Sequence, residues 1–165
     1  MTWVAADPDG DPLAYSVQYS PDKGQTWVAI GVNLADSGLI INTANLPGGQ
    51  AALVRVTATD GFNSTEATSP GTFTVDSHAP DVYIGSPDNG ITLTQGEPVV
   101  LHAYGTDVED GPLPADAFDW TSSLDGALDP GDLIIVDSLS AGTHDLTLTG
   151  RDADGNTATY SVQVT

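Results

Sequence analysis

The sequence contains no cysteine, which excludes disulfide bonds, thiol chemistry and cysteine-based zinc sites but does not identify the compartment. It also lacks any apolar run near the ~20 residues that a membrane-spanning helix requires. No basic segment followed by an apolar run comes after Met1. We therefore expect no membrane insertion, and either a secretion signal encoded upstream and removed or a chain that is a fragment.

Positive charge is nearly absent. Lys23, Arg55 and Arg151 are the only Lys and Arg residues against 23 Asp and Glu, which gives a net charge of −20. Nucleic-acid binding requires a basic surface and anionic lipid repels acidic proteins, so neither partner is expected. Asp far outnumbers Glu, and Asp is both a turn former and a short oxygen ligand. The charge therefore indicates solubility in high salt or neutralisation by bound metal.

Short segments that alternate apolar and polar residues, separated by Gly, Pro, Asp and Asn, fill the chain, whereas helical spacing is absent. This pattern predicts an all-β protein of sandwich or barrel type, with Trp27 and Trp120 in the core. The predicted strands cover residues 1–6, 13–19, 25–32, 38–46, 52–59 and 71–75 in the first half and 98–105, 117–122, 132–139, 143–150 and 157–165 in the second.

The two halves of the chain resemble each other. Residues 38–63 and 132–156 both read as strand, Leu-containing turn, strand and Asp-Gly, and residues 5–20 match residues 105–122 in the same way. We predict two tandem immunoglobulin-like β-sandwiches, at residues 1–76 and 82–165. Residues 77–81 form the predicted linker, because Pro80 favours extended geometry at Ala79.

The first half resembles a fibronectin type III domain in Trp3, "YSVQYS" (15–20) and "ALVRVTATDG" (52–61). The second half resembles the immunoglobulin-like or polycystic-kidney-disease-like modules of prokaryotic surface or secreted proteins. That likeness rests on "GTDVEDGPL" (105–113), "LSAGTHDLTLTGRDADGN" (139–156) and "YSVQVT" (160–165), without the WDFGDG-type signature of true polycystic-kidney-disease repeats. The resemblance implies spacer, adhesive or assembly roles outside the cell.

Acidic residues gather in loops that this topology places side by side at one end of each sandwich. Calcium binds six to eight oxygens, which such loops can supply. Neither sequence fits an EF-hand loop, which requires Glu at its twelfth position. A loop that starts at Asp7 has Gln18 there, and one that starts at Asp152 has Gln163. The candidate metal ligands are Asp7, Asp9, Asp11 and Asp60 in the first half, and Asp76, Asp81, Asp107, Glu109, Asp110, Asp152 and Asp154 at the linker and in the second half.

Two interpretations of these loops are open. In the first, the acids serve only as solvated turns, because Asp-Gly and Asp-Pro are ordinary turn formers. Crowded carboxylates, however, repel one another by a few kcal/mol per pair unless a cation intervenes. The linker acids Asp76 and Asp81 are expected near Asp107 and Asp152, which resembles the cadherin arrangement in which calcium stiffens successive modules.

The first module shows six strand candidates where seven are expected, because Met1 lies almost on the second-strand Trp3. A strand without a neighbour is a template for another chain. Either the chain begins inside the module and the module tolerates this, or a strand from a neighbouring subunit completes it and produces head-to-tail polymers.

Catalytic patterns are weak. His78, His102 and His144 are not expected to converge on zinc, no serine lies in G-x-S-x-G, and the acidic loops offer no substrate cleft. The sequence therefore predicts a non-enzymatic structural or adhesion module of an extracellular or cell-surface protein, with neighbouring modules or copies of itself as partners. The alternative is a carbohydrate- or protein-binding accessory module of a secreted enzyme, which an exposed aromatic platform would favour.

Overall fold

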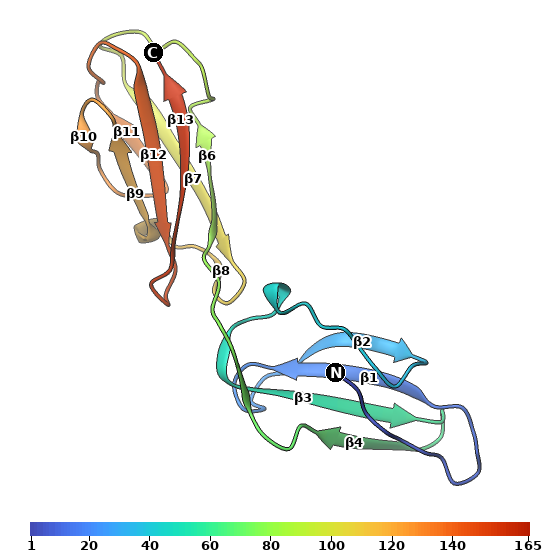
Figure 1. The fold of residues 1–165 in the computed structure, drawn as a ribbon. Helices are drawn as coiled ribbons and strands as arrows, with labels where there is room; N and C mark the ends of the chain where they lie inside the picture. Colours follow the sequence, from blue (N-terminus) through green and yellow to red (C-terminus); the bar gives the residue numbers. More distant parts are fainter. The chain divides into compact units, whose positions relative to one another are not determined.

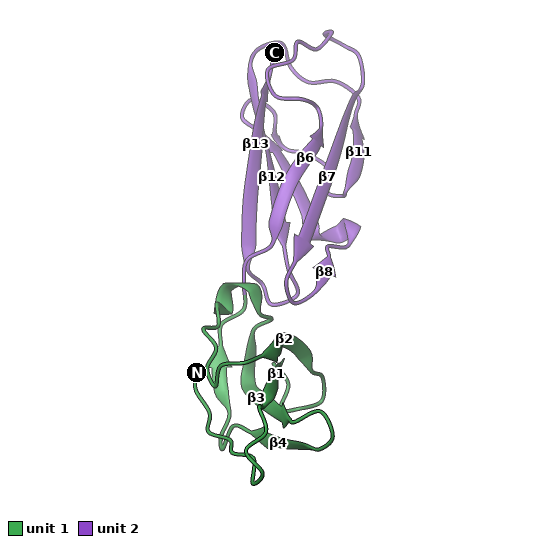
Figure 2. Ribbon diagram, turned by 90° about the vertical axis from the view of Figure 1, so that its right-hand side faces the viewer, with its two compact units in different colours: residues 1–77 green, residues 78–165 purple.

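The computed structural model describes residues 1–165 and divides into two compact units, residues 1–77 and 78–165 (Figures 1 and 2). The division falls at the start of the segment predicted as a linker. Both units are built from antiparallel β-strands, as the alternating sequence pattern predicts. Helical structure is limited to two single turns of 3₁₀ helix, Thr43–Asn45 (η1) and Ala115–Ala117 (η2), and no helix is long and apolar enough to cross a membrane.

Unit 1 is built on one sheet. Its strands are β1 (Ala14–Ser20), β2 (Val28–Leu34), β3 (Gly49–Thr59), β4 (Ser64–Thr68) and β5 (Phe73–Val75). The order is β2-β1-β3-β4, and β5 pairs with the first part of β3 (Figure 1). Alternate residues of β1 face the core, as the period of a half-buried strand requires. The buried core consists of Val17, Tyr19, Leu46, Ala52, Val54 and Val75.

The layer that covers this sheet is small. The Trp3 amide donates to the Ser37 carbonyl and the Leu39 amide to the Met1 carbonyl, both at 3.1 Å. Trp3 packs edge-on against Tyr15, with ring centroids 5.3 Å apart. Unit 1 therefore contains five strands, and residues 1–6, expected as a further strand, form only a single bridge between Thr2 and Gly38.

The strand predicted over residues 38–46 is wrong beyond a single bridge at Gly38. Asn42 Oδ1 instead accepts a hydrogen bond from the Ala44 amide at 3.1 Å and caps η1. Such local side-chain bonds compete with a sheet ladder, which explains why an apolar run ending in Asn and Thr does not stay extended. Conversely, β4 carries no apolar alternation and all five of its residues are exposed, so the sequence offers no signal for it.

Unit 2 contains two facing sheets. One has the order β6 (Asp81–Ser86), β7 (Val99–Asp107), β11 (Leu133–Val136), with β8 (Gly111–Pro112) at the end of β7. The other has the order β10 (Gly126–Ala127), β9 (Phe118–Ser122), β12 (His144–Arg151), β13 (Thr157–Val164) (Figure 1). This antiparallel pair of sheets is an immunoglobulin-like sandwich. Its buried core consists of Val99, Leu101, Ala103, Phe118, Trp120, Ile134, Leu146, Leu148, Val162 and Val164.

Trp120, Trp27 and His144 differ in how deeply they are buried. Trp120 is 1% exposed and its Nε1 donates to the Gly131 carbonyl at 2.9 Å, which confirms its predicted place in the core. Trp27 was placed wrongly, because it is half-buried outside the core and the Arg55 guanidinium lies 4.4 Å from its ring centroid. His144 is buried, with Nδ1 2.8 Å from Ser122 Oγ and Nε2 2.8 Å from the Ser140 carbonyl.

Candidate functional site

The acidic loops of unit 1 border one shallow hollow. This hollow of about 170 Å³ is lined by Asp7 and Asp60 together with small side chains such as Ala5, Ala6 and Ala58. The structure therefore brings the two loops together as predicted. Asp9 and Asp11 are exposed beside it, and their backbone amides donate to Asp7 Oδ1 at 2.9 and 3.1 Å.

The carboxylates of unit 1 are largely satisfied by their own turns. Asp60 Oδ1 accepts from the Phe62 and Asn63 amides at 2.7 and 2.6 Å. These bonds lower the pKa of Asp60, because they stabilise its charged form. The unit 1 loops therefore have the character of Asx turns, and nothing in them demands a cation.

The loops of unit 2 contain similar turns, but two of their acids, Asp107 and Asp152, are buried. Asp107 ends β7, and its Oδ1 accepts from the Glu109 and Asp110 amides at 2.8 and 3.0 Å. Gly111 follows with φ +75°, a conformation that glycine adopts without strain and that lets β8 turn back beside β7. This tight turn places three carboxylates within four residues.

The loop between β12 and β13 makes a second turn of this kind. Asp152 is buried, and its two carboxylate oxygens accept from the backbone amide and the side-chain amide of Asn156 at 2.7 and 2.9 Å. The Asp152 amide donates in return to the Asn156 carbonyl at 3.1 Å. Asp154, at the tip of the loop, is exposed.

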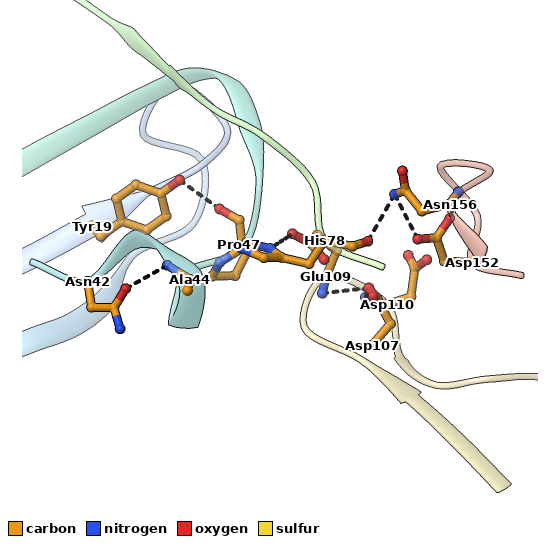
Figure 3. Close-up of polar contacts among 10 residues, drawn as sticks. All are labelled: Tyr19, Asn42, Ala44, Pro47, His78, Asp107, Glu109, Asp110, Asp152 and Asn156. Atoms are coloured by element: carbon orange, nitrogen blue, oxygen red, sulfur yellow. Dashed lines mark hydrogen bonds and ion pairs between the residues drawn. The ribbon is translucent and has the colours of Figure 1, made fainter. Parts of the chain in front are cut away.

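Three segments distant in the sequence meet at these turns (Figure 3). Asp110 Oδ2 accepts from the Ala153 amide at 2.9 Å, which joins the two loops. The Asn156 side chain also donates to the His78 carbonyl at 2.9 Å, and His78 Nδ1 lies 2.8 Å from Glu109 Oε1. The first residue of unit 2 is thus bound to both loops. We call His78, Asp107, Glu109, Asp110, Asp152 and Asn156 the loop cluster.

The Asp107 carboxylate is only partly hydrogen-bonded. It is 7% exposed, and its Oδ2 is buried without a hydrogen-bond partner. Burial raises the pKa of Asp107, and the neighbouring Glu109 carboxylate raises it further. A proton or a cation would stabilise a buried carboxylate oxygen that lies beside a second carboxylate.

The linker acids Asp76 and Asp81 are not members of the loop cluster, although Asp81 pairs with Thr106, the residue before Asp107. Asp81 is exposed at the start of β6, and Asp76 is exposed in unit 1 after β5. In the structure as it stands, no three His, Asp or Glu side chains converge in metal-ligating geometry. Calcium also uses carbonyl oxygens and water, and the loop cluster offers both carboxylate and backbone oxygens. Coordination there would require side-chain rotations within the two loops.

Two members of the loop cluster, His78 and Asn156, were not predicted from the sequence. His78 was counted only as a scattered histidine, since its contact with Glu109 spans 31 residues. Asn156 follows the Asp-Gly of the β12–β13 loop, a position that Asn commonly takes in turns. Only that turn chemistry could have pointed to it.

No protein-family description and no curated protein matches the chain. Solved structures that match include the four N-terminal Ig domains of Dscam1 isoform 6.9, at 12% identity and TM-score 0.40, covering 92% of this chain and 37% of that one. Three N-terminal domains of the bacteriophage RB49 Highly Immunogenic Outer Capsid protein match at 20% identity and TM-score 0.42, covering 97% and 50%. A Ca²⁺-stabilized adhesin of an Antarctic bacterium matches at 22% identity and TM-score 0.31, covering 94% and 41%.

This chain therefore spans half or less of each of those structures. At such identities and TM-scores, the matches say nothing about what this chain binds. The chain is similar to these proteins in its fold alone, which is all-β with immunoglobulin-like sandwich units.

Proposed function

We propose that this chain is a non-enzymatic structural or adhesive part of an extracellular or cell-surface protein, and that calcium bound at the loop cluster stiffens unit 2. The observation that supports this proposal is the buried Asp107 Oδ2, which has no hydrogen-bond partner and lies beside Glu109. A divalent cation would balance both carboxylates at once. The flexible, oxygen-rich loops suit calcium, whereas magnesium demands near-ideal octahedral geometry.

The mechanical consequence follows from the three segments that meet at the cluster. His78 is the first residue of unit 2, and it already contacts Glu109 and Asn156. An ion held by the two loops would fix this leading segment against the body of the sandwich. Stiffening of the point where the chain joins a module is useful in a spacer, because it resists bending under load.

Calcium removal tests this proposal on the full chain. Calcium added to protein pre-treated with EDTA should raise the unfolding temperature of unit 2, with a gain of about 2.7 kcal/mol when its concentration reaches 100 times the dissociation constant. Differential scanning calorimetry measures the unfolding temperature, and isothermal titration calorimetry measures the dissociation constant. Magnesium at the same concentration is the control. An unfolding profile that is identical in EDTA and in millimolar calcium would contradict the calcium site.

We also propose that a strand from a neighbouring copy completes the small layer of unit 1. Met1 and Trp3 direct their backbone hydrogen bonds toward residues 37–39, so in an antiparallel pair Thr2 and Val4 direct theirs to the opposite, open side. Val4, on this open side, is 99% exposed. Such an edge supports pairing with an added strand.

A proline at this edge tests the strand completion. Thr2→Pro removes an outward-facing amide, while the backbone hydrogen bonds of Met1 and Trp3 to residues 37–39 remain possible. Static light scattering should show concentration-dependent polymers for the unchanged chain, with at least a tenfold weaker association for Thr2→Pro. Thr43→Pro, at the first position of η1, is the control and should assemble normally. A chain that stays monomeric at every concentration, with and without calcium, argues against assembly through this edge.

A further inference from the structure

Strands β6, β7 and β11 form one sheet of unit 2 (Figure 2). The face of this sheet that is turned away from the core exposes apolar and aromatic side chains. The pairing register sets them side by side, with Tyr83 opposite Tyr104, His102 opposite Leu133 and Val100 opposite Ile135. The five apolar or aromatic members are between 41% and 63% exposed. We call Tyr83, Val100, His102, Tyr104, Leu133 and Ile135 the tyrosine face.

The centre of the tyrosine face is ordered before any partner arrives. The Tyr83 and Tyr104 rings are stacked, with centroids 5.0 Å apart and planes 16° apart. The Tyr104 hydroxyl lies 3.0 Å from His102 Nδ1. Gly85 leaves room for the Tyr104 ring, since a Cβ at this position would collide with it. Rigid, half-exposed tyrosines of this kind are typical of energetic hot spots in protein interfaces.

The surroundings of the face are acidic. Asp81 and Asp137 continue the outward-facing positions of β6 and β11, and both are exposed. Asp132 lines a hollow of about 290 Å³ beside Tyr83 and Tyr104. The only Lys or Arg of unit 2 is Arg151, which ends β12 in the other sheet. An apolar centre with a rim of one charge sign favours a partner with the opposite sign.

Two other occupants fit less well. A second copy of this chain has only three Lys and Arg residues to pair with the acidic rim, whereas the strand addition proposed for unit 1 depends on backbone hydrogen bonds and not on charge pairing. A sugar stacks on a free, flat ring, but Tyr104 is covered by Tyr83 on one side and adjoins His102 and Gly85. We propose that the tyrosine face docks a basic protein surface whose apolar side chains contact Tyr83, Tyr104 and the β11 side chains, and whose Lys or Arg residues pair with the acidic rim. This docking goes beyond the calcium site and does not depend on it.

An amphipathic basic peptide can test the inference directly. ¹⁵N-labelled full chain is titrated with an acetylated peptide of alternating Lys and Leu, with a peptide of alternating Lys and Ser, and with cellohexaose. We expect the Lys-Leu peptide to shift the amide resonances of β6, β7 and β11 and to bind at least tenfold more tightly than the Lys-Ser peptide. The double variant Tyr83→Ser, Tyr104→Ser should lose at least tenfold in affinity, whereas Tyr160→Ser, a change at an exposed tyrosine of β13, should not.

If the tyrosine variant does not fold, the double variant Leu133→Ser, Ile135→Ser tests the docking instead. Both of its side chains are exposed on the edge strand β11, so their replacement should not unfold the protein. The proposal is overturned if both basic peptides bind equally, since the acidic surface alone would then account for binding. It is also overturned if the foldable face variants bind like the unchanged chain, or if cellohexaose instead of the Lys-Leu peptide shifts the face.

Discussion

Asp107→Asn is expected to stabilise unit 2 when calcium is absent and to abolish the stabilisation that calcium provides. Asn keeps an oxygen for the Glu109 and Asp110 amides and replaces the unpartnered Oδ2 with an amide group that can donate to Glu109. Removing a buried unsatisfied charge should contribute about 1–2 kcal/mol in EDTA. In saturating calcium the order should reverse, because the variant has lost a charged ligand.

The pH dependence of stability, compared between the unchanged chain and Asp107→Asn, is a second test. The pKa of Asp107 is raised in the folded chain above the usual 3.8, so the unfolded chain releases this proton first as the pH rises. Without calcium, the contribution of Asp107 to stability is therefore fully present below pH 3.8 and is lost as the pH rises through the raised pKa. Asp107→Asn should lack this loss.

Denaturant unfolding in EDTA and in calcium, across this pH range, measures both effects. Asp154→Asn is the matched control, since it makes the same change at the exposed tip of the β12–β13 loop. It should shift stability by less than about 0.5 kcal/mol. If Asp107→Asn destabilised unit 2 equally with and without calcium, the carboxylate would be a structural turn residue and not a ligand.

The location of these acids could be predicted, but their individual roles could not. Asp107 and Asp152 stand where alternating strands end, and turn chemistry places both in loops at one end of the sandwich. Which of them keeps an unpartnered oxygen depends on the side-chain contacts with Glu109 and Asn156. Those contacts involve His78, which lies far away in the sequence, so no local pattern reveals them.

The strands show the same limit. Alternation predicts β1, β7, β9 and β12, which bury alternate residues, and β13, which does so only at its end with Val162 and Val164. It misses β4, whose residues are all exposed and whose pairing with β3 therefore depends on backbone hydrogen bonds. It also extends a strand over residues 38–46, where the Asn42 cap is decisive. Sequence periodicity reports burial, so elements that bury little escape it.

Trp120→Ala should unfold unit 2 far below the temperature at which unit 1 unfolds. Trp120 is 1% exposed, and truncation leaves a large cavity and an unpaired Gly131 carbonyl. Loss of a buried aromatic side chain costs about 3–5 kcal/mol, a large part of the stability of a small domain. Tyr19→Ala, which removes a buried ring and its 2.7 Å hydrogen bond to the Pro47 carbonyl, should do the same to unit 1 (Figure 3).

The comparison of the two variants shows whether each substitution destabilises one unit and leaves the other unchanged. The two buried cores share no residue, so each substitution removes contacts from one core alone. Hydrogen exchange followed by mass spectrometry reads the strands of each unit separately, and protection should be lost in β6–β13 for Trp120→Ala and in β1–β5 for Tyr19→Ala. If either variant lost protection equally in both units, the units would fold as one cooperative body. Calcium at the loop cluster would then stabilise unit 1 as well as unit 2, because ligand binding stabilises every part that unfolds together with its site.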